Sequence, residues 1–179
     1  MGMGDPVPRL DPATIADLLE ATAVTGTAEV HALGQAGATW PPAPGEWCAN
    51  AVVGHLLEAD RRGFAGRIRI ILAEDEPALV DWDQPAVAAA RDDCAKDLET
   101  ILDEFLPYRL EAAALMRTLG PAELARVGIH PRVGRLSAAG VAAEWVHHDR
   151  NHVRQLLEVG QAIAWQAMGA ARKFTDPKA

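Results

Sequence analysis

Residues 137–160 read SAAGVAAEWVHHDRNHVRQLLEVG and carry the clearest helical pattern in the chain. Ser137 is a residue type that caps the start of a helix, and Gly160 stands where a glycine commonly ends one. Between them, residues recur at alternating intervals of four and three: Val141, Trp145, His148, His152, Gln155 or Leu156, and Val159. This spacing predicts a helix that presents one seam to the interior of a helical bundle.

Three more helices are predicted upstream of this one, over residues 11–33, 48–73 and 86–119. Pro107 should kink or divide the third of them, because proline removes a helical hydrogen bond. A short amphipathic helix is expected over 161–173. No segment alternates strongly enough at period two to predict a strand. The fold class is therefore all-α, a four-helix bundle with a short extra C-terminal helix.

The composition is that of one ordinary domain. The chain has 179 residues, 49% of them hydrophobic, which is enough to bury a sizeable core. We expect a single domain over residues 11–173, with a flexible N-terminus (1–10) and a flexible tail (174–179). The 17 basic and 25 acidic residues give a net charge of −8, which disfavours nucleic acid and anionic membranes as partners and leaves a small-molecule substrate.

The cysteines and the lack of an apolar leader point to the cytoplasm. Cys48 and Cys94 form no CxxC pair, so neither a disulfide framework nor a thiolate zinc site is expected. In apolar helices such cysteines usually act as small hydrophobic residues rather than nucleophiles. No apolar run approaches the roughly 18 residues of a membrane-spanning helix, and the first ten residues do not resemble a secretion signal.

Three of the six histidines are candidate metal ligands. His148 and His152 are four residues apart, so their side chains lie on the same face of a helix. His55 lies on the predicted inner face of another helix, and a bundle can place it opposite the pair. Three histidine ligands leave positions for water or substrate, which is typical of a catalytic metal site. The alternative is a solvated or locally hydrogen-bonded histidine pair.

Other metal-site templates fit less well. The stretch HDRNH has Asp149 where the HExxH motif of metalloproteases needs glutamate. A di-iron bundle needs a Glu-x-x-His on each of two helices, and only residues 144–147 provide one. His147 should face about 100° away from His148, at the rim of the site. His31 and His130 are expected to be structural or surface residues, although the loop that holds His130 could roof the site.

Three acidic residues are candidates for catalytic or supporting roles. Asp149 borders the predicted metal face and could fix the tautomer of a histidine; the alternative is a surface carboxylate. Glu58 and Glu144 lie one turn from His55 and His148, respectively, and either could accept a proton from a thiol or water at the metal. For both glutamates the alternative is an ion pair with a nearby arginine.

Two segments resemble the DinB/YfiT-like superfamily. GEWCANAVVGHLLEADRRGFAGRI (45–68) is similar to its second helix, where a tryptophan precedes a helix with one metal-binding histidine before a leucine. HPRVGRLSAAGVAAEWVHHDRNHVRQLLEV (130–159) is similar to its later portion, which contains an H-D-x-x-H stretch and a following glutamine. The resemblance covers residues 13–159. Cys48 departs from the pattern, since the family often has serine or threonine as the cap at this position.

The resemblance implies an up-down-down-up four-helix bundle in which three histidines bind a divalent metal. The metal is often zinc or nickel, with iron, manganese or cobalt as further options. Carried over by position, the ligands are His55, His148 and His152. The superfamily includes bacillithiol S-transferases and mycothiol-dependent maleylpyruvate isomerases, and its members are frequently homodimers.

Three functions are compatible with these features. The first is a transferase in which the metal activates a low-molecular-weight thiol, with Arg62, Arg132 or Arg135 holding a substrate carboxylate. The favoured alternative for these arginines is a solvated position on the surface. The second is a hydrolase in which the metal activates water. The third is a metal-binding stress-response protein without turnover.

Overall fold

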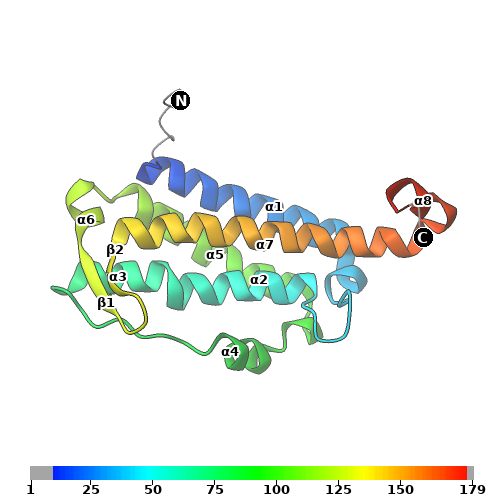
Figure 1. Ribbon diagram of the computed structural model, residues 1–179, viewed down its shortest axis with the longest axis horizontal. Coiled ribbons are helices and arrows are strands. Elements are labelled where there is room, and N and C mark those ends of the chain that lie inside the picture. The colour runs from blue at the N-terminus through cyan, green and yellow to red at the C-terminus, as the bar shows by residue number, and fades with distance from the viewer. Residues whose placement is uncertain (1–9, 177–179) are drawn as a thin grey trace, which may run out of the picture.

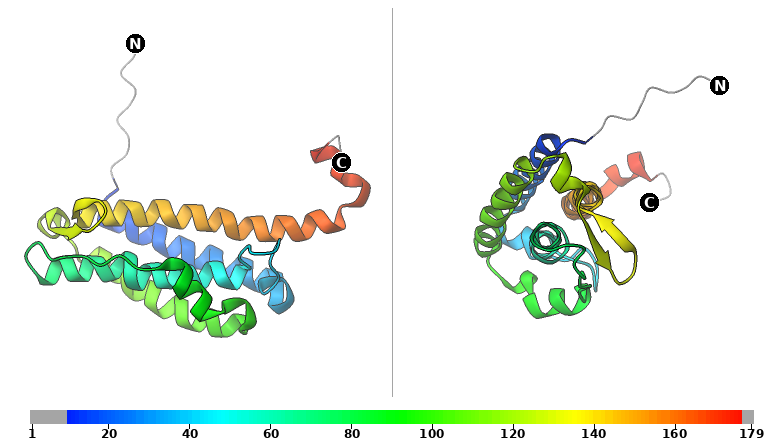
Figure 2. Two further views of the ribbon diagram at one scale, coloured as in Figure 1. Left: turned by 60° about the horizontal axis from the view of Figure 1, so that its bottom comes forward. Right: turned by 90° about the vertical axis from the view of Figure 1, so that its left-hand side faces the viewer.

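The computed structural model describes residues 10–176 and is an elongated helical bundle (Figures 1 and 2). Its α-helices are α1 (Pro12–Ala38), α2 (Ala49–Glu58), α3 (Ala65–Ala73), α4 (Gln84–Arg91), α5 (Leu98–Arg117), α6 (Pro121–Ala125), α7 (Ala138–Ala167) and α8 (Arg172–Thr175). A π-helical turn η1 (Ala59–Gly63) joins α2 to α3, and 3-10 turns η2 (Asp93–Ala95) and η3 (Gly169–Ala171) precede α5 and α8. Residues 1–9 and 177–179, parts of the termini expected to be flexible, lie outside the described residues.

Four long elements form the bundle, in the expected up-down-down-up order. Figure 1 shows α1 and α7 running in one direction along the bundle, and α2–α3 and α5 in the other. Because α3 and α5 run in the same direction, the connection between them, residues 74–97, has to run back along the length of the bundle. It contains α4, which packs on the outer side of α2. This connection is called the strap below.

The first helix begins as predicted and ends later. The Asp11 side chain accepts a hydrogen bond from Thr14 N at 2.7 Å, and Pro12 occupies the first turn. At the predicted end, Gly34 has a positive φ of 63°, which glycine adopts without strain. The chain then resumes a helical path to Ala38, so Gly34 kinks the helix and does not end it.

The second predicted helix, 48–73, is interrupted by the π-helical turn η1. One extra residue in this turn rotates the chain, so that Asp60 is fully buried while Arg61 and Arg62 remain outside. A side chain at Gly66 would collide with the carbonyl of Arg61, since an added Cβ would lie 1.9 Å from that oxygen. Glycine at this position therefore lets α3 follow the π turn directly.

The third predicted helix, 86–119, is two helices. Asp92 adopts a left-handed conformation (φ 48°) and ends α4, and Asp97 caps the start of α5 through Glu99 N at 2.9 Å. Pro107 does not divide α5, which is continuous from Leu98 to Arg117. The break lies at the aspartates, whose side chains compete with helical hydrogen bonding.

Residues 127–137 form a β-hairpin that the sequence pattern did not predict. Strands β1 (Val127–His130) and β2 (Gly134–Ser137) pair antiparallel, with His130 opposite Gly134. Gly134 has a φ of 72°, which closes the tight turn. Ile129 also exchanges backbone hydrogen bonds with residues 77–79 of the strap. Each strand is four residues long, too short for alternation to be recognised.

Helix α7 starts at the predicted cap and runs past the predicted end. Ser137 Oγ accepts a hydrogen bond from Gly140 N at 3.0 Å. Gly160 lies inside the helix, and the left-handed glycine that follows the last turn is Gly169 (φ 52°). Residues 161–167 therefore continue α7, and the extra C-terminal helix is the short α8, which reaches Thr175, beyond the expected boundary at 173.

Two apolar clusters fill the bundle on either side of its middle. One joins α1, α3, α5 and the first half of α7 around Trp145 and Ile68. The other joins α1, α2, α5 and the second half of α7 around Phe105 and Leu156. No helix within residues 10–176 is both long and apolar enough to cross a membrane.

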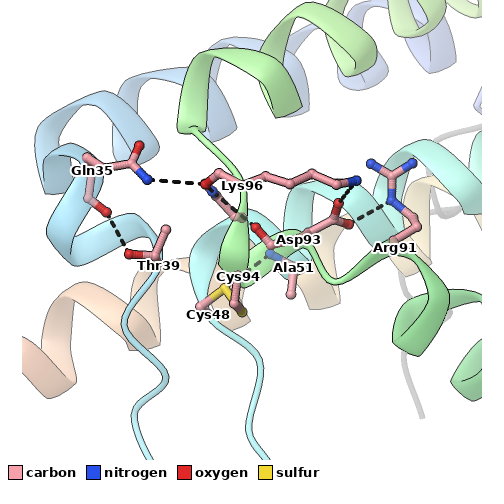
Figure 3. The surroundings of a disulfide bond; sticks show 9 residues. Gln35, Thr39, Cys48, Ala51, Arg91, Asp93, Cys94 and Lys96 are labelled. Atoms are coloured by element: carbon pink, nitrogen blue, oxygen red, sulfur yellow. Dashed lines mark hydrogen bonds and ion pairs between the residues drawn. A yellow bond between two sulfur atoms is a disulfide. The ribbon is translucent and has the colours of Figure 1, made fainter.

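Cys48 and Cys94 form a disulfide, which corrects the expectation of two separate hydrophobic cysteines (Figure 3). Cys48 precedes α2 and Cys94 lies in η2, so the bond ties the end of the strap to the start of α2. Cys48 also caps α2, with Sγ accepting a hydrogen bond from Ala51 N at 3.4 Å. The cytoplasmic location was predicted in part from unpaired cysteines, and the disulfide removes that argument. The location stays a prediction.

Candidate metal centre

Three histidines converge where α2 faces α7. His55 comes from α2, and His148 and His152 come from successive turns of α7. One ring nitrogen of each lies within 4.8 Å of the others, and the Nε2 atoms of His55 and His148 are 3.0 Å apart. The structure thus brings together the three residues selected from the sequence.

Gln155 fixes the orientation of one of these rings. Nδ1 of His152 lies 2.9 Å from Oε1 of Gln155, an acceptor, so Nδ1 carries the proton. Nε2 of His152 then keeps its lone pair free for a metal ion. The i,i+3 spacing on α7 places the glutamine beside the histidine.

Aromatic rings enclose the cluster. The ring centroid of Trp47 lies 4.9 Å from that of His55 and 6.1 Å from that of His152. Trp82 of the strap stacks on His55 at 6.1 Å, and Phe64 contacts His148 edge-on at 5.0 Å. As a result His55 is only 6% exposed, and the other two histidines are half-buried.

Burial keeps His55 and His152 in the uncharged form that binds metals. It lowers the pKa of His55 to about 3, helped by repulsion from His152 and His148. Burial also lowers the pKa of His152, with a further contribution from His148. Neutral imidazole is the ligand form of histidine, so both rings are ready to coordinate at neutral pH without first losing a proton.

Behind His148 lies a fully buried ionic network. Arg109 of α5 donates to both carboxylate oxygens of Asp60, at 2.8 and 3.0 Å, and to both oxygens of Asp149. Trp145 Nε1 donates to Asp60 at 2.8 Å. These four side chains are 0% exposed. One arginine thus joins carboxylates from η1 and α7, which holds Asp149 and the neighbouring turn of α7 in place.

The network shifts the pKa values of its carboxyl groups in opposite directions. Burial raises the pKa of Asp60 to about 6, aided by the charge of Asp149 and opposed by Arg109. Burial also acts to raise the pKa of Asp149, but the charge and hydrogen bonds of Arg109 outweigh it and the pKa falls below its usual value. Asp149 is therefore ionised beside His148, with its Oδ1 3.9 Å from Nδ1 of that ring.

Two of the predicted acidic candidates, Glu58 and Glu144, differ in whether their carboxylates are already hydrogen-bonded to arginines. Glu58 is buried and accepts hydrogen bonds from three arginines, Arg61 at 3.1 Å, Arg62 at 2.7 Å and Arg91 at 3.1 Å. Burial tends to raise its pKa, but the hydrogen bonds from Arg62 and Arg61 lower it. These contacts fit the ion-pair alternative. Glu144 is exposed and lines a cavity with His148, so it is the freer proton acceptor.

The remaining histidines lie outside the cluster. His147 is exposed on α7. His31 is exposed and lies 3.2 Å from Glu99. His130 of β1 is 6% exposed and lines the same cavity as His148, so the predicted link does border the site.

Two cavities adjoin the cluster, one beside each histidine of α7. A cavity of about 620 Å³ opens beside His152 and is lined by Trp47 and Gln155, among others. A smaller cavity of about 180 Å³ opens beside His148 and contains several charged side chains: Arg67, Asp81, Arg132 and Glu144. The cluster can therefore be approached from two directions.

Arg67 is the most buried cation of the smaller cavity. Its side chain is 12% exposed, its Nε is buried without a hydrogen-bond partner, and Asp81 lies 3.6 Å away. Of the arginines proposed to hold a carboxylate, Arg132 also lines this cavity. Arg62 is bound to Glu58, and Arg135 pairs with Glu76 on the outer surface.

The match to a family model agrees with the helical architecture and the position of the cluster. The model of the DinB superfamily matches residues 18–156, which include all three histidines. The chain belongs to the DinB superfamily. The resemblance noted in the sequence is thereby confirmed.

Two curated proteins are similar to this chain over about two thirds of its length or more. "Putative metal-dependent hydrolase YfiT" of Bacillus subtilis (strain 168) is 24% identical over 126 residues, 70% of either chain. "Putative metal-dependent hydrolase OB0782" of Oceanobacillus iheyensis is 22% identical over 122 residues, 68% of this chain and 69% of the relative. The solved structure of YfiT, described as having an unusual four-helix bundle topology, aligns with a TM-score of 0.77 at 21% identity, over 91% of this chain and 96% of that one.

Sequence reasoning missed the ionic network and the part played by the strap. Arg109 follows Phe105 and precedes Ala112 and Met116 at helical spacing, so a charged residue sits on an otherwise apolar stripe. Such a residue needs a buried partner, and this was the signal available in the sequence. Trp82 gave no comparable signal, because its place over His55 depends on the path of the strap.

Proposed function

We propose that this chain is a metal-dependent transferase that activates a low-molecular-weight thiol. In this proposal His55, His148 and His152 hold one divalent ion, which is zinc or nickel. Three converging imidazoles are a donor set that fits such an ion, and they leave room for further ligands. A bound ion supplies Lewis acidity that lowers the pKa of a thiol or water at the site. Manganese, iron and cobalt bind to the same donors with lower affinity than nickel does.

The observation that carries transfer over hydrolysis is the pair of cavities. Transfer of a group to a thiol needs two organic substrates at one centre, whereas hydrolysis needs one substrate and water. Here a cavity opens beside His152 and a second beside His148. The first has room for a thiol compound, and the second can take the charged end of an electrophile.

The surrounding side chains have separate roles in this proposal. Gln155 holds the His152 ring in the tautomer that leaves Nε2 free. Asp149, held by Arg109, positions His148 through its charge and backbone. Glu144 accepts the thiol proton, since it borders the cavity, is exposed and forms no salt bridge with any residue of the range 10–176. Trp47 and Trp82 restrict water around His55.

Metal content and thiol conjugation test this proposal together. Purified protein is reconstituted with zinc or nickel, and its metal content is measured alongside the rate at which it conjugates cysteine or glutathione to 1-chloro-2,4-dinitrobenzene. We expect stoichiometric metal and thiol-dependent acceleration, both lost in His148→Ala and both kept in His147→Ala, which alters an exposed neighbour on the same helix. Substoichiometric metal in the wild-type protein would overturn the site.

Hydrolysis is the second candidate, because both curated relatives are named as metal-dependent hydrolases. The same preparation is assayed with ester and amide substrates in the absence of thiol. Metal-dependent hydrolysis without conjugation would select this alternative. Stoichiometric metal with neither activity would favour a metal-binding protein without turnover.

Arg67 is the residue that we propose to bind a substrate carboxylate. The charges of Asp81, at 3.6 Å, and of Glu144 act on Arg67, but its Nε has no hydrogen-bond partner among the described residues, so a carboxylate in the cavity would complete its pairing. Arg67→Met should raise KM for a carboxylated electrophile by about tenfold or more, while leaving KM for an uncharged one unchanged. An equal effect on both substrates would contradict this role.

A further inference from the structure

The two sulfurs of the disulfide lie in different surroundings. Cys48 is 0% exposed and caps α2, with its Sγ 3.4 Å from the N–H of Ala51. Cys94 is half-buried and lines a cavity of about 450 Å³ between the strap and α2, together with Trp47 and Ala88. A molecule entering this cavity can therefore approach Cys94 but not Cys48.

The chemistry of thiol–disulfide exchange depends on this difference. A thiolate attacks one sulfur, and the other leaves as a thiolate, faster when its negative charge is stabilised. The start of α2 stabilises such a charge on Cys48, through the N–H of Ala51 and the positive end of the helix dipole. The accessible sulfur is thus the one to be attacked, and the buried sulfur is the better leaving group.

The charges beside the bond are of both signs. Asp93 adjoins Cys94, but its carboxylate is paired with Arg91 Nε at 2.7 Å and with Lys96 Nζ at 2.8 Å (Figure 3). Two cations thus pair with Asp93, whereas Asp92, which also lines the cavity, is an exposed carboxylate. Arg91 also contacts Glu58 and Glu104, which share its charge.

We propose that Cys94 is a site of modification by low-molecular-weight thiols. A thiolate RS⁻ forms a bond to Cys94 Sγ, the Cys48–Cys94 bond breaks, and Cys48 takes the electron pair as a thiolate held at the start of α2. A second thiolate can attack the mixed disulfide, releasing RSSR and the Cys94 thiolate. The disulfide is reduced by two electrons and the thiols are oxidised, so no further reagent is needed.

Other contacts keep the strap in place after the bond opens. Asn50 Nδ2 donates to the carbonyl of Lys96 at 3.1 Å, and Arg91 remains bound to Glu58. Modification should therefore loosen residues 92–96 without unfolding the bundle. The inference needs no metal at the histidine cluster and stands independently of the proposed activity.

Site-resolved trapping tests the proposal. The oxidised full chain is treated with limiting 2-mercaptoethanol, quenched with acid, alkylated with N-ethylmaleimide and mapped by peptide mass. We expect mercaptoethanol on Cys94 and maleimide on Cys48, exceeding the reverse pattern by about tenfold or more. This preference should vanish in concentrated guanidinium chloride, where both sulfurs are exposed. Equal labelling of the folded chain, predominant adduct on Cys48, or no adduct at all would overturn it.

Single-cysteine variants give a second, independent measurement. Cys48→Ser leaves Cys94 free, and Cys94→Ser leaves Cys48 free. With 5,5′-dithiobis(2-nitrobenzoic acid), we expect the thiol of Cys94 to react at least about tenfold faster than that of Cys48, because only Cys94 borders the cavity. Similar rates in two folded variants would contradict the assigned accessibility.

Discussion

The ionic network around Arg109 and the histidine cluster lie next to each other in the bundle, but they differ in how completely their polar atoms are paired. Arg109, Asp60 and Asp149 are fully buried, and each carboxylate accepts two hydrogen bonds from the arginine. His148 and His152 are partly exposed, ring nitrogens of the cluster face one another, and Nδ1 of His148 has no hydrogen-bond partner within the described residues.

This difference separates a structural region from a functional one. A buried polar group that has its full set of partners holds the fold in place and has no capacity for a ligand. Converging donors that lack partners carry a free-energy cost, which a bound ion removes. Of the three acidic candidates, Asp149 and Glu58 thus serve the fold, and the exposed Glu144 is left for chemistry.

The largest effect is expected from breaking the network. Arg109→Met should lower the free energy of unfolding by about 3–5 kcal/mol, because it leaves two buried carboxylates without their partner. Urea denaturation followed by circular dichroism measures the loss. Arg69→Met is the matched control on a half-exposed arginine, and it should cost about 1 kcal/mol or less. Equal losses in the two variants would remove the distinction between the regions.

The disulfide should make the next largest contribution. It closes a loop with a sequence separation of 46, and loss of such a constraint from the unfolded chain costs about 4 kcal/mol. The double variant Cys48→Ser/Cys94→Ser should therefore unfold at lower urea concentration, and adding a reductant should shift the wild-type protein to the same midpoint. A wild-type midpoint that ignores the reductant would contradict this role for the bond.

Metal binding should stabilise the folded protein through the histidine cluster. It should not change the loss of unfolding free energy that Arg109→Met causes. At about a hundredfold excess over Kd, a bound ion adds about 2.7 kcal/mol to the free energy of unfolding. The melting temperature should thus rise with zinc or nickel in the wild-type protein and in His147→Ala, but not in His55→Ala. A rise that persists in His55→Ala would place the metal elsewhere.

The cluster was predictable from the sequence because helical periodicity assigns faces. His148 and His152 share a face by their spacing, and His55 lies on the inner stripe of a second helix, so their meeting needs only a bundle. The four bundle helices were predictable for the same reason. The π turn η1 lies within one of them without changing its overall course, and periodicity gave no sign of it.

The network, the hairpin and the disulfide depend on tertiary contacts that no local pattern encodes. Arg109 contacts Asp60 across 49 positions of sequence and Asp149 across 40. Cys48 and Cys94 meet because the strap returns along the whole bundle, and a sequence without CxxC spacing does not reveal that path. The hairpin pairs strands too short to show a period.

The smallest expected effect concerns the pH response of the metal-free cluster. The folded pKa of His55, about 3, lies below its ordinary value of 6.5, so the unfolded chain takes up the proton first as pH falls. Stability is therefore complete above about pH 6.5 and is lost progressively toward pH 3. Between about pH 7.5 and pH 6 the loss should be on the order of 1 kcal/mol.

Urea denaturation of the chelator-treated protein across this range measures that slope. His55→Asn removes the buried ring and should flatten the slope, whereas His147→Asn alters an exposed ring and should keep it. Saturating zinc should steepen the response, since protons then compete with the ion for the same nitrogens. If His55→Asn kept the full slope, the acid sensitivity would belong to His152, whose pKa burial also lowers. The ionic network has the opposite pH response in this range, because the raised pKa of Asp60 lets the folded chain take up a proton before the unfolded chain does.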